Sequence, residues 1–212
     1  MTFRAKWAAA AAPPARVRLH EWHKLGVWEK LHQLLLSKLR YAGKIDWSRA
    51  AADATTLRAL RGGDKTGPTP TDRGRKGTKD HLLTDGKGVP LSAHATAANV
   101  NEVTQLKALV EAVPPVAGKP GAPRRKPEAI LADRAYDSQP LREWLWAKGI
   151  IPFLAKRGEG HGSGLGKYRY VVEQCFAFFK GFRRLRLRYE RTAFMHEAAL
   201  QLAACLICFR HL

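Results

Sequence analysis

Apolar residues recur at three- and four-residue steps in several segments of the chain, which predicts helices that each bury one face. The clearest example covers residues 20–41, where Trp22, Trp28 and Leu35 belong to an apolar stripe. The same spacing predicts further helices at 101–113, 138–148, 168–181 and 194–209. Asn99 or Asn101 suits the N-cap of the 101–113 helix.

Short apolar or alternating runs predict strands between these helices. The expected strands are 45–53, 79–84, 89–96, 129–132 and 150–154, the last two buried. A tight turn at 84–88 joins the second and third strands as a hairpin. Gly-rich and basic loops are expected at 61–77, 114–128 and 156–167, and the first of them should be mobile. This order favours an α/β protein with a mixed sheet and helices on both faces.

The length of 212 residues suits one core, preceded by less regular sequence. Residues 1–19 are rich in Ala, Pro and Arg and predict a low-complexity or disordered tail. Residues 20–44 form an N-terminal helical segment, and 45–212 form the main domain. The alanine run before Pro13 and Pro14 is too short for a signal peptide, so we expect a cytoplasmic protein. The apolar run at 194–209 is shorter than a bilayer span, so no membrane partner is expected.

The formal net charge of +19, from 37 Lys and Arg against 18 Asp and Glu, changes this picture most. Such a charge attracts polyanions, so nucleic acid is the leading class of partner, and a nucleoid-associated location follows. The alternative is a basic surface without a specific partner.

Three cysteines argue against a disulfide framework. Cys205 and Cys208 form a Cys-x-x-Cys pair, but no second pair completes a zinc site, so buried thiols are expected. His81 and His94 are interpreted as structural or solvent-exposed residues. The Gly158–Gly166 stretch lacks the Lys-Ser/Thr ending of a nucleotide-binding loop, and Ser163 lacks the setting of a nucleophile.

Three carboxylates stand in settings that suit metal-dependent chemistry. Asp53 and Asp133 each follow a strand-like run, and Glu173 lies on the predicted 168–181 helix. Hard divalent cations prefer clusters of carboxylate oxygens. An aspartate after a strand is also a common turn former or helix cap. Asp137 is therefore a rival to Asp133, and Asp46 and Asp64 are rivals to Asp53.

Arg169, Glu173 and Lys180 share one helix face, within about 40° of one another, and Arg184 would lie about 20° further round if the helix continued. The opposite face is apolar, so these charges would be held in one direction. A simple Arg–Glu surface pair is the alternative.

At these segments the chain resembles the DDE transposases of bacterial insertion sequences, and most closely insertion-sequence family five. The resemblance runs from about Trp22 to the end of the chain. It rests on five strings: Asp-Trp-Ser-Arg-Ala-Ala-Ala-Asp53-Ala-Thr-Thr-Leu-Arg-Ala, Lys-Asp-His-Leu-Leu-Thr-Asp-Gly-Lys-Gly-Val-Pro-Leu, Asn-Val-Asn-Glu-Val-Thr-Gln-Leu, Leu-Ala-Asp133-Arg-Ala-Tyr-Asp and Arg169-x3-Glu173-x6-Lys180 followed by Phe-Arg-Arg-Leu-Arg.

The resemblance implies an RNase H-like fold and an Asp53, Asp133 and Glu173 triad that acts in catalysis and binds metal. It implies two Mg²⁺ or Mn²⁺ ions, and it implies double-stranded DNA partners, namely the element's inverted repeats and target DNA. A homodimer is the expected active assembly.

The expected DNA contacts are basic residues on the 168–181 helix and in two further segments. They are Arg169, Lys180, Arg124, Arg125, Lys126, Arg183, Arg184, Arg186 and Arg188.

Two departures from the family pattern matter. Gly166 stands where the family often has Tyr, with Tyr168 nearby but out of place. Residues 1–19 do not resemble the family's longer helical segment, and no pair of helices for end recognition can be drawn there. We therefore expect a truncated copy with weakened recognition of its own inverted repeats. Two other functions stay open: a non-catalytic DNA-binding remnant and a cellular RNase H-like nuclease.

Overall fold

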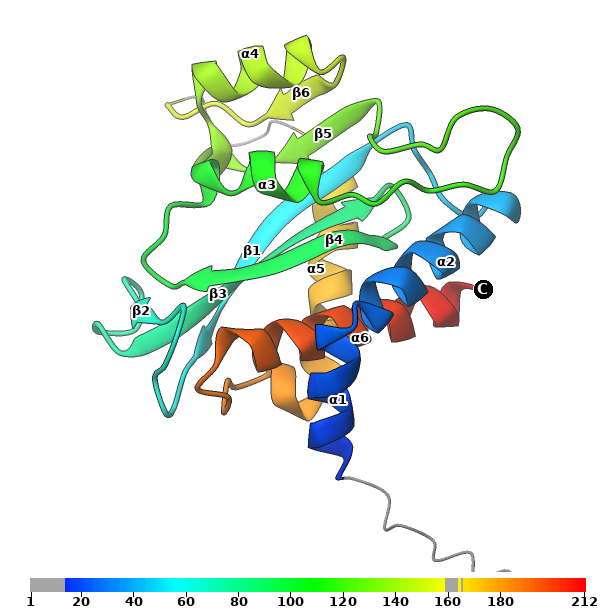
Figure 1. The fold of residues 1–212 in the computed structure, drawn as a ribbon. Helices are drawn as coiled ribbons and strands as arrows, with labels where there is room; N and C mark the ends of the chain where they lie inside the picture. The colour runs from blue at the N-terminus through cyan, green and yellow to red at the C-terminus, as the bar shows by residue number, and fades with distance from the viewer. Residues whose placement is uncertain (1–13, 159–163, 165) are drawn as a thin grey trace, which may run out of the picture.

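A six-stranded mixed sheet forms the centre of the protein, as a computed structural model describes it for residues 14–158, 164 and 166–212 (Figure 1). The expected tail at residues 1–13, and His161 and Ser163 of the Gly-rich loop, lie outside the described residues. The strands are β1 (Ala50–Arg58), β2 (Gly67–Pro68), β3 (Lys76–Asp85), β4 (Pro90–Ala97), β5 (Ala129–Ala132) and β6 (Ile151–Leu154).

Antiparallel pairing joins β1 to β3 and β3 to β4, whereas β5 runs parallel to both β1 and β6. The short β2 pairs with the beginning of β3. The predicted hairpin is therefore present, with its turn between Asp85 and Pro90. This sheet with helices packed on it confirms the expected RNase H-like α/β class.

Helices cover both faces of the sheet (Figure 1). The helices are α1 (Ala15–Lys24), α2 (Val27–Tyr41), α3 (Leu106–Glu111), α4 (Gln139–Ala147), α5 (Gly166–Gly181) and α6 (Ala193–His211), with 3-10 turns η1 (Glu102–Thr104), η2 (Arg134–Tyr136) and η3 (Arg183–Leu185). Alternation along β1 divides the core between the faces. Ala50 and Ala52 pack with residues of α2, α3 and α4, whereas Ala51 packs with residues of α5 and α6.

The last helix, α6, is an apolar element of the core. By length and composition its 19 residues could cross a membrane, so the expectation that this run is too short for that was wrong. Within the structure, α6 packs on α1, α2 and β4, which accounts for its apolar composition. Cys205 and Cys208 are buried free thiols, as predicted, and burial raises the pKa of both.

The N-terminal segment contains two helices, not the single helix expected at 20–41. α1 begins at Ala15, inside the expected tail, and Gly26 separates it from α2 in a left-handed conformation, with φ of 68°. α1 is held by ring contacts of His20 and His23 with Phe194 of α6, at centroid distances of 5.0 and 4.4 Å. The Ala-, Pro- and Arg-rich composition of residues 1–19 led to the prediction of a disordered tail, although Ala and Arg favour helices.

Other boundaries also differ from the expectations. The 61–77 loop contains β2 and the beginning of β3. The expected 101–113 helix is divided into η1 and α3, with Asn101 capping η1 by accepting from the Val103 N–H, as predicted. β6 is an edge strand and not a buried one, because β5 is its neighbour in the sheet and Ile151 and Phe153 are exposed.

Candidate active site

Asp53 and Asp133 lie beside each other because of the register between β1 and β5. Ala51 pairs with Leu131 in the parallel ladder, and each aspartate follows two residues later. Alternation places both on the α5 face, the face of Ala51. β1 continues to Arg58 through its pairing with β3, so Asp53 lies within a strand and not at its end. Only the pairing of β1 with β5 ends near Asp53.

The surroundings of Asp53 disfavour its ionised form. Burial is the main cause and raises the pKa of Asp53 from 3.8 to about 6, and the charges of Asp133 and Glu102 add to the increase. The Ala54 N–H, which donates to Oδ1 at 2.8 Å, and the Arg169 guanidinium oppose the rise. A bound cation would favour the ionised carboxylate.

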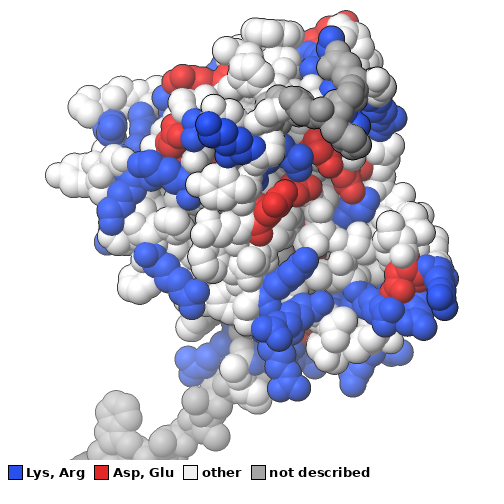
Figure 2. Space-filling model, turned by 180° about the vertical axis from the view of Figure 1, so that it is seen from behind, with Lys and Arg blue, Asp and Glu red and all other residues white. Residues whose placement is uncertain are grey.

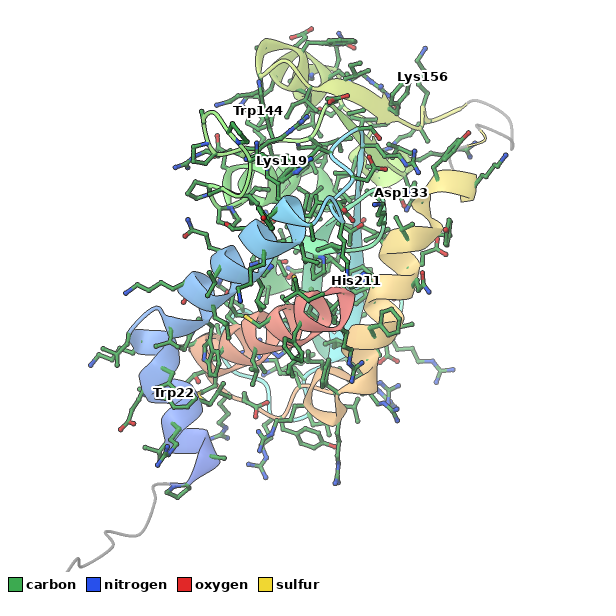
Figure 3. All side chains as sticks on the ribbon, turned by 90° about the vertical axis from the view of Figure 1, so that its right-hand side faces the viewer. Trp22, Lys119, Asp133, Trp144, Lys156 and His211 are labelled. Carbon is green, nitrogen blue, oxygen red and sulfur yellow. The ribbon has the colours of Figure 1, made fainter. Side chains whose placement is uncertain are left out.

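Asp133 caps η2 by accepting from the Ala135 N–H at 2.9 Å. Its rival Asp137 instead accepts from Arg142 at 2.8 Å and from the Arg157 backbone N–H at 2.7 Å, and these two bonds lower the pKa of Asp137. Asp46, a rival to Asp53, accepts from the Ser48 N–H and hydroxyl. Asp133, which directly follows β5, remains the candidate there, and Figure 3 shows it beside the beginning of α5.

The helix α5 brings Arg169 to the aspartates. Nη2 of Arg169 lies 3.5 Å from Oδ2 of Asp53, and Nε of Arg169 is buried without a hydrogen-bond partner. Glu173 is exposed one turn further along α5, whose buried side holds residues such as Val172 and Cys175. The described residues contain no group of three His, Cys, Asp or Glu side chains placed to hold a metal ion. The expected convergence of three carboxylates is thus not present as a formed metal site, and their roles remain predictions.

Two further residues border the aspartates. Tyr136 is fully buried, and its hydroxyl has no hydrogen-bond partner among the described residues. Burial raises the pKa of Tyr136, and the charges of Glu102, Asp53 and Asp133 raise it further. Glu102 forms an ion pair with Lys79 at 2.9 Å. Both Tyr136 and Glu102 lie in the sequence segments that carry the family resemblance. That position was the one sequence signal that could have identified them as site residues.

The residues present fit a hard divalent cation in part. Asp53 and Asp133 offer oxygen ligands, and burial, which raises the pKa of Asp53, disfavours its ionised form unless a cation is nearby. The unpartnered Arg169 Nε and Tyr136 hydroxyl could donate to a further oxygen, such as one of water or phosphate.

Apart from Arg169, which lies beside Asp53, the predicted DNA-contacting residues fall into three groups. Lys180, Arg183, Arg184, Arg186 and Arg125 are exposed, although Arg184 pairs with Glu190 and Arg186 donates to the Lys180 carbonyl oxygen.

Arg124 and Lys126 have intramolecular partners. Arg124 pairs with Glu128 at 2.9 Å and lies over the Trp47 ring, and Lys126 donates to the Lys148 carbonyl oxygen. α5 ends at Gly181, so Arg184 lies on η3 and not on the helix face of Glu173.

Arg188 was wrongly predicted to contact DNA. Its side chain is fully buried and donates to Thr78 Oγ1 and to the carbonyl oxygens of Glu190 and Lys65. The alternating Arg and apolar residues of this segment do not reveal which arginine points inward.

Residues 48–208 match the family described as the transposase DDE domain, and the chain belongs to this family. It is a DDE transposase of the insertion-sequence type, in accordance with the expected resemblance.

A protein of Burkholderia cepacia assigned as the transposase for insertion sequence element IS402 is 54% identical over 151 residues, which cover 71% of this chain and 72% of that protein. An uncharacterized 16.2 kDa protein of the same element is 55% identical over 53 residues, which cover 25% of this chain and 36% of that protein.

Among solved structures, the Mos1 transposase paired-end complex with left transposon end is similar over 86% of this chain and 62% of its own chain. Its TM-score is 0.34 and its sequence identity is 13%.

Proposed function

We propose that the protein cleaves and joins DNA strands at insertion-sequence ends by metal-dependent phosphoryl transfer. The observation that carries the proposal is the pair of aspartates on the α5 face, with the pKa of Asp53 raised to about 6. Asp53 and Asp133 would hold the divalent cations, Mg²⁺ or Mn²⁺, with Glu173 as the third ligand. Two such ions, when bound, lower the pKa of the attacking hydroxyl and stabilise the leaving oxygen in an in-line displacement.

The protein's own residues would bind and orient the phosphate. Arg169 lies 3.5 Å from Asp53, and its guanidinium would bind and orient the scissile phosphate beside that carboxylate. The Tyr136 hydroxyl can donate to an oxygen near the two aspartates. The burial of Tyr136 fixes its ring, so this donor is held in one direction.

The proposed substrates are the element's inverted repeats and target DNA, both double-stranded. A net charge of +19 supports attraction to these polyanions. We further propose a homodimer as the active assembly and a cytoplasmic, nucleoid-associated location.

The test is an assay with a pre-nicked DNA end in the presence of Mg²⁺ or Mn²⁺. Strand joining by the wild-type chain supports the transposase, and cleavage alone would identify a nuclease. Asp53→Asn, Asp133→Asn and Glu173→Gln should each abolish the reaction and leave the circular dichroism spectrum unchanged. Undiminished activity of the Asp133→Asn variant would overturn the assignment.

The binding-only remnant is the second candidate function. It is favoured because the described residues contain no three carboxylates placed to hold a metal ion together. Binding of the nicked end without cleavage or joining, with either metal, would establish it.

A further inference from the structure

Two adjoining clefts lined by arginines lie at the far end of β1 from Asp53. The first, about 900 Å³, contains Arg58, Arg61, Arg75, Lys76 and Arg191. The second, about 510 Å³, shares Arg61 and Arg191 and adds Arg16, Arg183, Arg184 and Tyr189. Of the residues that line the two clefts, eight are Lys or Arg and only Glu190 is acidic. We call these two clefts the arginine basin.

The arginine basin brings together parts of the chain that are distant in sequence. The beginning of α1, the end of β1 and the segment that follows α5 lie at the same end of the molecule (Figure 1). Seen from behind, a dense group of basic side chains covers the lower end of the surface (Figure 2).

Backbone hydrogen bonds join the segment around buried Arg188 to residues that line the arginine basin. Besides the side-chain bonds of Arg188, its backbone N–H donates to the Arg58 carbonyl oxygen at 2.9 Å, and its carbonyl oxygen accepts from the Leu60 N–H at 3.1 Å. The Asp64 N–H donates to the Arg191 carbonyl oxygen at 2.9 Å. Gly63 approaches so closely that an added Cβ would lie 2.0 Å from that oxygen.

Several of these arginines have no intramolecular partner. Arg58 pairs with Asp72 at 2.5 Å, and Arg184 pairs with Glu190. In contrast, Arg61, Arg183 and Arg191 are exposed and make no ion pair with any described residue. Unpaired like charges that lie close together repel one another, and a polyanion would relieve that repulsion. Guanidinium groups bind phosphate oxygens in pairs, which favours a phosphate backbone as the occupant.

We infer that the arginine basin is a second DNA-binding site, which holds the duplex backbone away from the proposed reaction centre. This inference rests on the proposed function for its choice of DNA. Five residues separate Asp53 from Arg58 along β1, or about 17 Å at the usual rise of a strand. At 3.4 Å per base pair, the basin therefore begins about five base pairs from the scissile phosphate.

The experiment measures the affinity of the full chain for duplexes of about 4, 8, 12 and 16 base pairs ending at the cleavage position. Fluorescence anisotropy in EDTA excludes any chemistry, so loss of catalysis does not affect the result. The test variant is Arg61→Gln with Arg191→Gln. The control variant is Lys38→Gln with Lys119→Gln, which removes two exposed positive charges from α2 and from the 114–128 loop.

We expect the Arg61→Gln/Arg191→Gln variant to lose at least about tenfold in affinity for the three longer duplexes and little for the shortest. Its salt slope for the longer duplexes should also become less steep by about 2, as expected for two lost phosphate contacts. The control variant should lose less than about threefold at every length.

Equal losses in both variants would show that net charge alone acts, and a loss independent of duplex length would place these arginines at the reaction centre. Either result overturns the inference. Tighter binding of an RNA duplex of equal length would also overturn it and would identify RNA as the occupant. None of these outcomes bears on strand joining, which tests the proposed function separately.

Discussion

Two arginines in the segment after α5 have opposite roles. Arg186 is exposed and donates to the Lys180 carbonyl oxygen at 2.6 Å, whereas Arg188, two positions later, is fully buried. Both were predicted to contact DNA because both are basic residues of the same segment. Only the packing of this segment against β1 and β3 decides which arginine points inward, so that difference could not be predicted from the sequence.

Arg188→Lys should destabilise the protein by about 3 kcal/mol, because it removes several hydrogen bonds of a buried charged group. The matched change Arg186→Lys, at the exposed position, should cost less than about 0.5 kcal/mol. Urea denaturation measures both free energies of unfolding. Similar values for the two variants would contradict the structural role of Arg188.

His32 makes stability depend on pH. Burial lowers the pKa of His32 from 6.5 to about 4, against the opposing effect of its 2.8 Å hydrogen bond to the Pro90 carbonyl oxygen. The folded state thus holds His32 neutral while the unfolded state takes up a proton. Stability from this residue is complete above about pH 6.5 and is lost as the pH falls toward 4.

We expect a loss of up to about 3 kcal/mol from His32 between pH 7 and 4. His32→Gln retains a donor toward Pro90, so its stability should fall less steeply over the same range. The control His20→Gln changes an exposed histidine. Parallel stability profiles of wild-type and His32→Gln protein, measured by thermal denaturation, would rule out this account.

At the scale of elements, strand and helix types were predictable and some boundaries were not. β3, β4, β5 and α5 were expected close to their observed positions. β1 was expected at 45–53, from a weak apolar signal through Ala50, Ala51 and Ala52. The ladder with β3 extends β1 to Arg58, and such a non-local pairing leaves no local signature.

The connection between α1 and α2 depends on a glycine in a left-handed conformation. Gly26 has φ of 68°, and an added Cβ would meet nothing closer than 3.8 Å, so only backbone strain opposes a side chain. Gly26→Ala should therefore cost about 1 kcal/mol.

Gly181 at the end of α5 provides the control, since it lies outside the left-handed region and has open space. Gly181→Ala should be neutral or slightly stabilising. Chemical denaturation of both variants decides the matter. A harmless Gly26→Ala would mean that the chain can join the two helices in another way.

At the scale of the whole molecule, charge governs the expected binding to DNA. If about six phosphates are contacted, the logarithm of the binding constant should fall with the logarithm of salt concentration at a slope of about −5. Titrations of a 16-base-pair duplex at several salt concentrations give this slope. A slope near zero would show that the net charge of +19 has another purpose.

The candidate site was predictable only in part. Asp53 and Asp133 were identified from the residues around them, and the β1–β5 register places them together. Glu173 was identified as well, but the structure does not bring it to the aspartates as a formed metal site. Tyr136 and Glu102 were missed, because their proximity to the aspartates depends on contacts between residues distant in sequence. The expectation that no helix pair exists near the N-terminus was wrong, so the weakened end recognition inferred from it loses its basis.

The packing of α6 on α2 has a consequence for synthesis of the chain. Cys205 of α6 donates to the Trp28 carbonyl oxygen of α2 at 3.4 Å, and Gln201 lies 3.5 Å from His32. The apolar side of α2 is therefore covered only after the final residues, which form α6, have been translated. At 5–20 residues per second, the delay after α2 emerges is on the order of ten seconds or more. During that interval the side of α2 that packs on α6 in the folded protein is not covered by α6, and any version that stops before Ala193 leaves it so.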